Sequence, residues 1–456
     1  MITGLLFQSC VQDRDMESTV VVQQISAEPD GMHPFNDNSA YRSFIFQYTQ
    51  KTLIKLDLKT LKYIPFLVES IPDGEGVDEL EYNYTIKEGV KWDDGSALMA
   101  KDVEFTTKVV LCHLTNNAQI RGNYNTVIES INLDSEDPFK FTMKAQSLHV
   151  DNKYIFSEIY LQQKEYWDPK GILDDITFEQ ILSKDFEETE KITNWFKKLN
   201  SAENVNEPDK LVGLGGYQVT EWEKDEYIII NKKNKWWGEN DTSIYNQNFP
   251  DKIVFRIIKE NSATSLALKS EKIDVTTSIG VAELNKLKQR KSFNDNYTSD
   301  FIDGYVYSYI GLNMKPDGIK HKKFFVDKRV RRAMAYLTPV DEIIKVFKYG
   351  QATRQVAQLS PLKENYNNSL ELIPLDIEKA KELLEESGWI DTDGDNIRDK
   401  MVDGKKIQFS FNLSYIAKPE SKEMALMIQE SMYKAGIDAK PTPMDFKIFY
   451  NRAYKH

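Results

Sequence analysis

The chain has 456 residues, of which 41% are hydrophobic and 29% are charged, and its formal net charge at pH 7 is −12. This length and composition indicate a globular protein with two or three packed units. The negative charge argues against a nucleic-acid-binding protein, because such proteins need a basic surface against the phosphates, and no apolar run reaches the roughly 18 residues of a membrane-spanning helix.

The few cysteines and histidines limit the kinds of site that the chain can build. Cys10 and Cys112 are the only cysteines, which excludes a disulfide framework and a cysteine-rich zinc site. The five histidines form no H-x-H or H-x-x-x-H pair, so a zinc site built from histidines is not expected. The G-x-S-x-G and H-E-x-x-H motifs of hydrolases are also missing. The sequence therefore argues against a hydrolase.

The amino terminus reads MITGLLFQS and is followed by Cys10. An apolar stretch that ends in a small residue and a cysteine resembles the end of a lipoprotein signal peptide, which would make Cys10 the lipidated residue and residues 1–18 a signal remnant and tether. A basic segment before the apolar stretch is missing and the stretch is short. An ordinary flexible terminus is the alternative interpretation.

The most strongly patterned stretch is Tyr84–Phe105, which reads YTIKEGVKWDDGSALMAKDVEF. It predicts a strand up to Gly89 and a tight turn at 93–96, because Asp bonds its own backbone and Gly accepts a positive φ. A helix should follow, with Asp102 in its first turn. Nothing in the stretch has the pattern of a catalytic site, so we interpret it as a structural corner between strand and helix.

A second patterned stretch covers residues 211–238 and contains the glycines Gly213, Gly215 and Gly216. They match neither G-x-x-x-x-G-K-[ST] nor G-x-G-x-x-G before a helix, so a phosphate-binding loop is not predicted. The glycines predict instead a bend where the backbone passes close to a neighbour. Residues 253–258 favour a fully buried strand, and 263–269 favour a helix.

These stretches, the Glu28-Pro29 turn and the segment FVDKRVRRA at 325–333 resemble the extracellular solute-binding proteins of family 5, the peptide/nickel class that serves ABC importers. The resemblance runs from about Thr19 to His456 and is strongest for the oligopeptide- and dipeptide-binding type, from which the chain differs by an apparently truncated C-terminus. It implies an α/β type II periplasmic-binding-protein fold, in which two lobes are joined by a hinge and the second lobe is incomplete. Lobe one is expected at 19–255, with an inserted subdomain at about 56–170, and lobe two at 256–456 without its C-terminal part.

The resemblance also implies a function. We expect a substrate-binding lipoprotein that captures peptides or a related small solute in an inter-lobe cleft and delivers it to the permease of an ABC importer. A peptide-sensing surface lipoprotein that is not coupled to transport is the alternative. The expected protein is a monomer in the periplasm or cell envelope, held at the membrane by a lipid anchor, with no nucleic-acid partner.

Seven residues lie where the family pattern approximately places ligand contacts. They are Glu28, Arg121, Tyr124, Tyr307, Asn313, Lys315 and Tyr415. Glu28 could equally cap a turn, and each tyrosine could equally serve packing. Residues 305–310 alternate tyrosines with other residues and predict a strand with an aromatic face.

A further pattern is the run of carboxylates DTDGDNIRD at 391–399. Asp391, Asp393, Asp395 and Asp399 are oxygen ligands at the alternating spacing that calcium selects, although the sixth and twelfth positions lack the Gly and Glu of an EF-hand. A weak calcium site and a solvated Asp turn without metal both fit this pattern. No other cofactor is expected.

Overall fold

The chain folds into two compact units, 1–293 and 294–456, and each is described by itself. The structure is a computed structural model. It describes residues 20–36, 39–201, 210–302, 304, 306–317, 321–363, 366–402, 404–445, 448, 449 and 452. The expected lipidation site, Cys10, lies outside the described residues.

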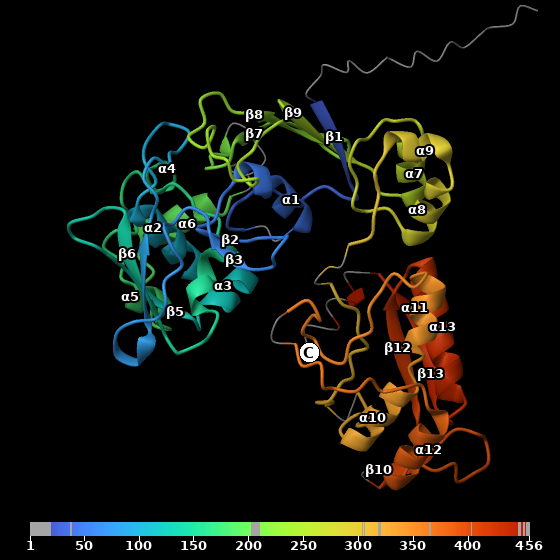
Figure 1. Ribbon diagram of the computed structural model, residues 1–456. Coiled ribbons are helices and arrows are strands. Elements are labelled where there is room, and N and C mark those ends of the chain that lie inside the picture. Colours follow the sequence, from blue (N-terminus) through green and yellow to red (C-terminus); the bar gives the residue numbers. More distant parts are fainter. Residues whose placement is uncertain are drawn as a thin grey trace, which may run out of the picture. The chain divides into compact units, whose positions relative to one another are not determined.

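The first unit is organised around a four-stranded mixed sheet in the order β1-β9-β8-β7. Its strands are β1 (Val20–Ile25), β9 (Lys252–Ile257), β8 (Tyr227–Lys232) and β7 (Tyr217–Glu223). Strand β1 runs parallel to β9, with Val20 opposite Lys252, and the other two pairs are antiparallel. Helix α1 (Ala40–Thr49) packs beside this sheet (Figure 1), and its Phe46 shares an apolar core with Phe255 of β9.

Strand β9 is buried on one face only. Ile253 and Phe255 are in the core, whereas Val254 between them is half-buried. The expectation of a fully buried strand at 253–258 is therefore wrong. In a sheet with antiparallel neighbours one face usually packs on the core while the other keeps some solvent contact. The expected helix at 263–269 is confirmed as α7 (Asn261–Lys269).

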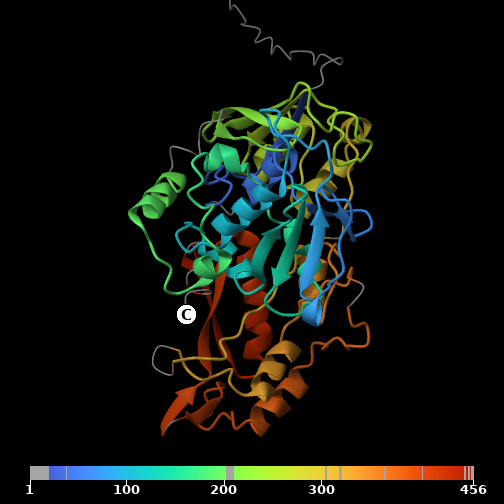
Figure 2. The ribbon, with the colours of Figure 1, turned by 90° about the vertical axis from the view of Figure 1, so that its left-hand side faces the viewer.

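A second sheet of the first unit has three antiparallel strands in the order β4-β6-β5 (Figure 2). They are β4 (Glu81–Thr85), β6 (Lys140–Ala145) and β5 (Ile128–Leu133). Tyr84 of β4 stacks on Phe141 of β6, with ring centroids 5.1 Å apart. Helix α2 (Ala100–Leu111) packs against β5 and buries Val103 and Val109 completely. The predicted order of strand, turn and helix along Tyr84–Phe105 is thus confirmed.

The remaining elements of the first unit are short. They are β2 (Ile54–Leu56), β3 (Tyr63–Pro65), the 3₁₀ turns η1 (Val77–Glu79) and η2 (Asn152–Ser157), and the helices α3 (Ala118–Tyr124), α4 (Lys164–Trp167), α5 (Phe178–Leu182), α6 (Glu190–Leu199) and α8 (Val281–Lys288). Helix α9 (Lys291–Asn296) spans the boundary between the two units. Strands β2 and β3 form an antiparallel hairpin.

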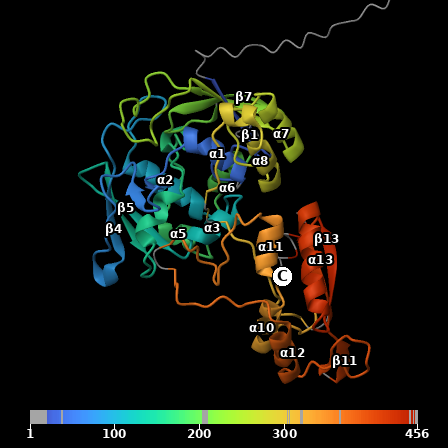
Figure 3. The same cartoon turned by 45° about the vertical axis from the view of Figure 1, so that its right-hand side comes forward.

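The second unit is built on a parallel pair of strands, β12 (Ser410–Ile416) and β13 (Asp438–Met444). Helix α13 (Pro419–Tyr433) connects these strands and packs along them (Figure 3). The other elements of this unit are α10 (Lys328–Tyr336), α11 (Val340–Phe347), α12 (Ile377–Glu386), β10 (Asp399–Val402) and β11 (Lys405–Gln408). Its core is aromatic, since Phe324 stacks on Phe409 with ring centroids 5.1 Å apart and Trp389 packs on the same ring.

Three expectations, about the fold class, the lobe boundary and one strand, have different outcomes. The α/β class is confirmed, while the lobe boundary expected at residue 255 falls inside β9 and stays a prediction. The strand expected at 305–310 is wrong: among the described residues 306–317 there is none. Val306 is 94% exposed there. The alternation is real, but a strand is stable only when its backbone pairs with a neighbour.

Candidate functional site

The corner predicted at 93–96 is a closed turn held by its own side chains. The backbone N–H of Trp92 donates to the carbonyl of Ser96 (2.9 Å), and Gly95 has a φ of +85°. Asp94 accepts a hydrogen bond from the backbone N–H of Ser96 (2.9 Å). Gly95 supplies the left-handed conformation that the turn requires, which other residues adopt only with strain.

Asp102, at the start of α2, fastens this corner to the rest of the unit. Its buried carboxylate accepts hydrogen bonds from the backbone of Met99 (3.0 Å), the indole N–H of Trp92 (3.3 Å) and the backbone of Lys164 (2.8 Å). Desolvation by burial raises the pKa of Asp102 above its usual range. Because all of its partners are backbone or indole donors, Asp102 organises the fold and leaves no oxygen directed at a ligand.

Asp93 connects the corner to the glycine-rich stretch. Its carboxylate accepts from the backbone N–H of Gly213 (3.1 Å) and from Nζ of Lys233 (2.5 Å), and Lys233 also donates to the carbonyl of Gly213 (2.7 Å). A Cβ on Gly215 would lie 2.1 Å from the carbonyl oxygen of Tyr48. The predicted close approach of backbones is therefore confirmed, and both stretches are structural.

Three of the seven expected ligand contacts lie in the first unit, where all make structural contacts. Glu28 accepts a hydrogen bond of 2.6 Å from the backbone of Asp225, in the turn between β7 and β8. Arg121 donates to the carbonyls that follow α2, and Tyr124 is 7% exposed in the core. Burial raises the pKa of Tyr124 above its usual range.

The other four expected contacts lie in the second unit. Tyr307 is 38% exposed and its ring lies 5.7 Å from that of Tyr309. Asn313 accepts a hydrogen bond of 3.1 Å from the backbone of Lys315, which brings these two expected residues together. Tyr415 is half-buried in β12. The part of all seven residues in ligand binding stays a prediction.

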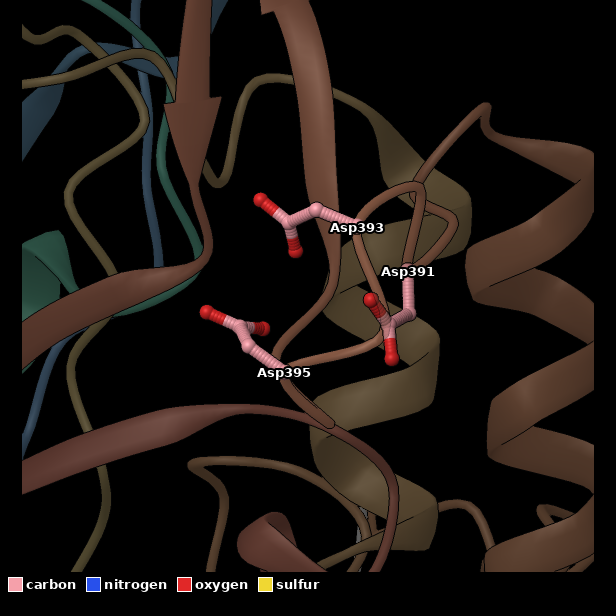
Figure 4. Close-up of side chains that lie close together, drawn as sticks. All are labelled: Asp391, Asp393 and Asp395. Carbon is pink, nitrogen blue, oxygen red and sulfur yellow. The ribbon is translucent and has the colours of Figure 1, made fainter.

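The acidic loop before β10 brings together three of its four expected carboxylates. Oxygens of Asp391, Asp393 and Asp395 lie within 4.8 Å of one another (Figure 4). Asp399 belongs to a different arrangement, since it is buried at the start of β10 and accepts hydrogen bonds of 2.8 Å from the hydroxyl of Thr392.

The clustered carboxylates already have partners in the protein. Asp391 accepts from the backbone of Gly394 (2.8 Å) and of Asn396 (3.0 Å). Asp393 accepts from Nζ of Lys406 (2.7 Å), and this hydrogen bond lowers the pKa of Asp393. Gln408 donates to Asp395. A calcium ion would therefore compete with a lysine and an amide for two of its ligands.

The structure also reveals a polar pocket that the sequence did not predict. A cavity of about 440 Å³ lies between the loop before α3 and the end of α6. Asn200, which ends α6, donates to the carbonyl of Leu114 (2.7 Å) and accepts from the backbone of Asn116 (3.1 Å). Asn200 lies 84 positions after Asn116 and 86 after Leu114. A local sequence pattern therefore could not have predicted the pocket.

Within the described part of the chain, no helix combines the length and the apolar character needed to cross a bilayer.

Known proteins resemble the chain along nearly its whole length. The sequence profile of the bacterial extracellular solute-binding proteins, family 5 (middle part), matches residues 62–456. The oligopeptide-binding protein AppA of Bacillus subtilis is 26% identical over 401 residues, which cover 87% of this chain and 63% of AppA. The dipeptide-binding protein of Escherichia coli is 24% identical over an alignment of 465 residues, with 99% of this chain and 76% of that protein covered. The chain thus spans less than two thirds of the length of AppA.

Solved structures agree in fold. NikZ of Campylobacter jejuni, in complex with Ni(L-His), superposes with a TM-score of 0.69 at 20% identity, and 94% of this chain and 74% of NikZ are covered. This likeness identifies the α/β fold of the periplasmic binding proteins. Since the family profile matches most of the sequence, the chain belongs to the bacterial extracellular solute-binding proteins of family 5.

Proposed function

We propose that this chain is the substrate-binding component of an ABC importer, that it captures peptides, and that it presents them to a membrane permease. The observation that carries the proposal is the family match over residues 62–456. The curated relatives named above are an oligopeptide- and a dipeptide-binding protein, which favours peptides over other solutes. The role is binding and presentation, without a chemical step.

The expected mechanism is capture by a closing cleft. An extended peptide offers its backbone to strand-like hydrogen bonding, while its side chains occupy roomy pockets. A ligand promotes closure only through the difference between its affinities for the closed and the open states. Glu28, Arg121, Tyr124, Tyr307, Asn313, Lys315 and Tyr415 are the proposed contacts.

Identification of the carried ligand tests the proposal. Native mass spectrometry of the full-length protein, purified from its own cells, should find bound peptides. Thermal unfolding of the same protein should shift upward with mixed di- to pentapeptides and stay unchanged with free amino acids, because only a ligand of the folded state stabilises it. No bound peptide and no shift with any peptide would contradict the proposal.

Coupling to transport needs a separate test. In a reconstituted importer, peptide uptake should depend on this protein. Peptide binding with no effect on uptake would favour the alternative, a peptide-sensing surface lipoprotein.

We also propose that Cys10 carries a lipid that attaches the protein to the membrane. The apolar stretch before Cys10 supports this anchor. The protein should partition into the detergent phase of a cloud-point separation, and Cys10→Ala should move it to the aqueous phase. Cys112→Ala is the matched control, since its buried thiol is shielded from modification. Equal partitioning of the unchanged protein and the Cys10→Ala variant would rule out the anchor.

A further inference from the structure

The polar pocket beside α3 combines a ligand-sized volume with an excess of positive charge. Its volume of about 440 Å³ is within the range of small-molecule sites. Polar groups along its wall come from His113, Asn116, Asn117, Arg121, Lys197 and Asn200. No acidic side chain is among the described residues that line it, although the chain as a whole has a net charge of −12.

One nitrogen of the Arg121 guanidinium is fixed by hydrogen bonds within the protein, and the other two nitrogens are available as donors to a ligand. Its Nη1 donates to the carbonyls of Cys112 (3.5 Å), His113 (3.4 Å) and Thr115 (3.2 Å). Its Nε and Nη2 donate to no described residue of the chain. Together Nε and Nη2 form the flat pair of donors that matches the two oxygens of a carboxylate.

The second cation of the pocket is Lys197, in the last turn of α6. Its side chain is exposed, and in the described part of the structure it has neither an ion pair nor a hydrogen bond. His113 differs, because its Nε2 already contacts the carboxylate of Glu188 (2.9 Å) and this pair adds no net positive charge. The unsatisfied charge in the pocket thus comes from Arg121 and Lys197.

We propose that this pocket is a binding site for a carboxylate group, with Arg121 as its fixed bidentate donor and Lys197 as a second cation. Asn116 and Asn200 add amide groups that suit the polar part of the same ligand. Two sources supply this chemistry: a free small carboxylate, and the carboxy terminus of a bound peptide. The peptide source rests on the proposed function, whereas the free carboxylate does not.

Calorimetric titration of the full chain with three probes separates these sources. The probes are succinate, trialanine with a free carboxy terminus, and trialanine with a C-terminal amide. Lys197→Ala should weaken binding of the carboxylate source about threefold, as expected for one exposed ion pair. Arg121→Gln should weaken it about tenfold or more, because a charge-assisted bidentate contact is lost.

Controls separate binding from folding. Lys191→Ala removes the same charge from the first turn of α6, away from the pocket, and should leave binding unchanged. Arg121→Gln could loosen the end of α2, so Arg121→Lys and far-UV circular dichroism accompany it. A loss in Arg121→Lys with unchanged circular dichroism identifies the bidentate donor, since the charge is kept and the paired donors are not.

Each outcome of the titrations either supports or overturns the carboxylate site. Succinate binding that depends on Lys197 and Arg121 supports the site with a free carboxylate. Trialanine binding that depends on them, and a loss of that dependence with the amide, supports the site with a peptide terminus. Peptide binding that is equal in all variants, together with no succinate binding that depends on Lys197 and Arg121, would overturn the site and leave the proposed function intact. Succinate binding that depends on Lys197 and Arg121, without trialanine binding, would support the site for a free carboxylate and exclude the trialanine terminus as its ligand. No dependence on Lys197 and Arg121 for any probe would overturn the site.

Discussion

The carboxylate of Asp93 accepts a hydrogen bond of 3.1 Å from the backbone of Gly213, which lies 120 positions further along the chain. Its other oxygen accepts from Lys233, which in turn donates to the carbonyl of Gly213. One side chain thus joins the two stretches that carry much of the family resemblance. Substitution at this joint should change stability rather than ligand affinity.

Asp93→Asn should lower the free energy of unfolding by about 2 kcal/mol, because the side chain of Lys233, 9% exposed, would lose its carboxylate partner. Urea unfolding followed by tryptophan fluorescence measures this loss. Lys233→Met and the double variant complete the cycle. The double variant should lose less than the sum of the single losses, as residues in contact do. Additive losses would show that the two side chains do not act as a pair.

Gly215→Ala should destabilise the first unit by about 2–3 kcal/mol or more. Its new Cβ would lie 2.1 Å from the carbonyl oxygen of Tyr48, so backbone must move. Gly122→Ala is the matched control, since nothing lies within 4 Å of a Cβ there and the position is in helix α3. This control should be neutral or stabilising by about 0.5–1 kcal/mol. Equal effects of the two substitutions in thermal unfolding would contradict the close packing at Gly215.

Lys51 has a buried amine, and its effect on the free energy of unfolding should depend on pH. Its Nζ donates to the carbonyl of Tyr245 (3.1 Å) and lies 5.0 Å from the ring centre of Phe66. Burial, and to a smaller extent the nearby charge of Lys55, lower the pKa of Lys51 to about 7. In the unfolded chain the amine titrates near 10.5, so between pH 7 and 10.5 the unfolded state binds more protons. The contribution of Lys51 to stability therefore falls as the pH drops from 10.5 to 7 and is constant below.

Lys51→Met should consequently raise the free energy of unfolding by about 1–2 kcal/mol at pH 7 and below, because it removes a desolvated cation at the loss of one hydrogen bond. The gain should fade as the pH approaches 10.5. Denaturant unfolding at a series of pH values measures it. Lys59→Met, at an exposed position, should show no such trend. A gain that is independent of pH would mean that the pKa of Lys51 is the same in the folded and the unfolded chain.

Calcium should bind the loop at 391–395 only weakly, with a Kd of about 10⁻⁴–10⁻³ M, as in extracellular modules. Asp393→Ala should abolish the heat of calcium titration. Lys406→Met should tighten binding, because it removes the ammonium group that contacts Asp393 at 2.7 Å. Arg329→Met, at an exposed cation elsewhere in the same unit, is the control. Absence of heat in both the unchanged protein and Lys406→Met would leave a solvated turn as the correct interpretation.

The sequence predicted those parts of the fold whose signals are local. The Asp93–Ser96 turn and helix α2 follow from residues within a few positions of one another, and both are present. The close approach at Gly215 also follows from its sequence, although its neighbour Tyr48 could not be named in advance. The partner is distant in the chain, and periodicity carries no information about it.

The wrong or missed predictions also depend on partners that are distant in the chain. The alternation at 305–310 predicts a strand, but a strand needs a pairing neighbour, and the described residues 306–310 belong to no strand. Asp399 has the spacing of a metal ligand, yet it is buried against Thr392 and Lys406. The pocket at Arg121 is lined in part by Asn200, whose approach depends on how α6 packs.

The parallel pairing of β1 with β9 sets an order of events during synthesis. Strand β1 leaves the ribosome before β9, and the partner of Val20 is Lys252. At the usual rate of translation, on the order of ten seconds or more pass between the synthesis of β1 and that of β9. Until then its run of Val20, Val21 and Val22 is an unpaired edge that invites wrong pairing. A binding factor that holds nascent chains would therefore matter most while residues 26–251 are being made.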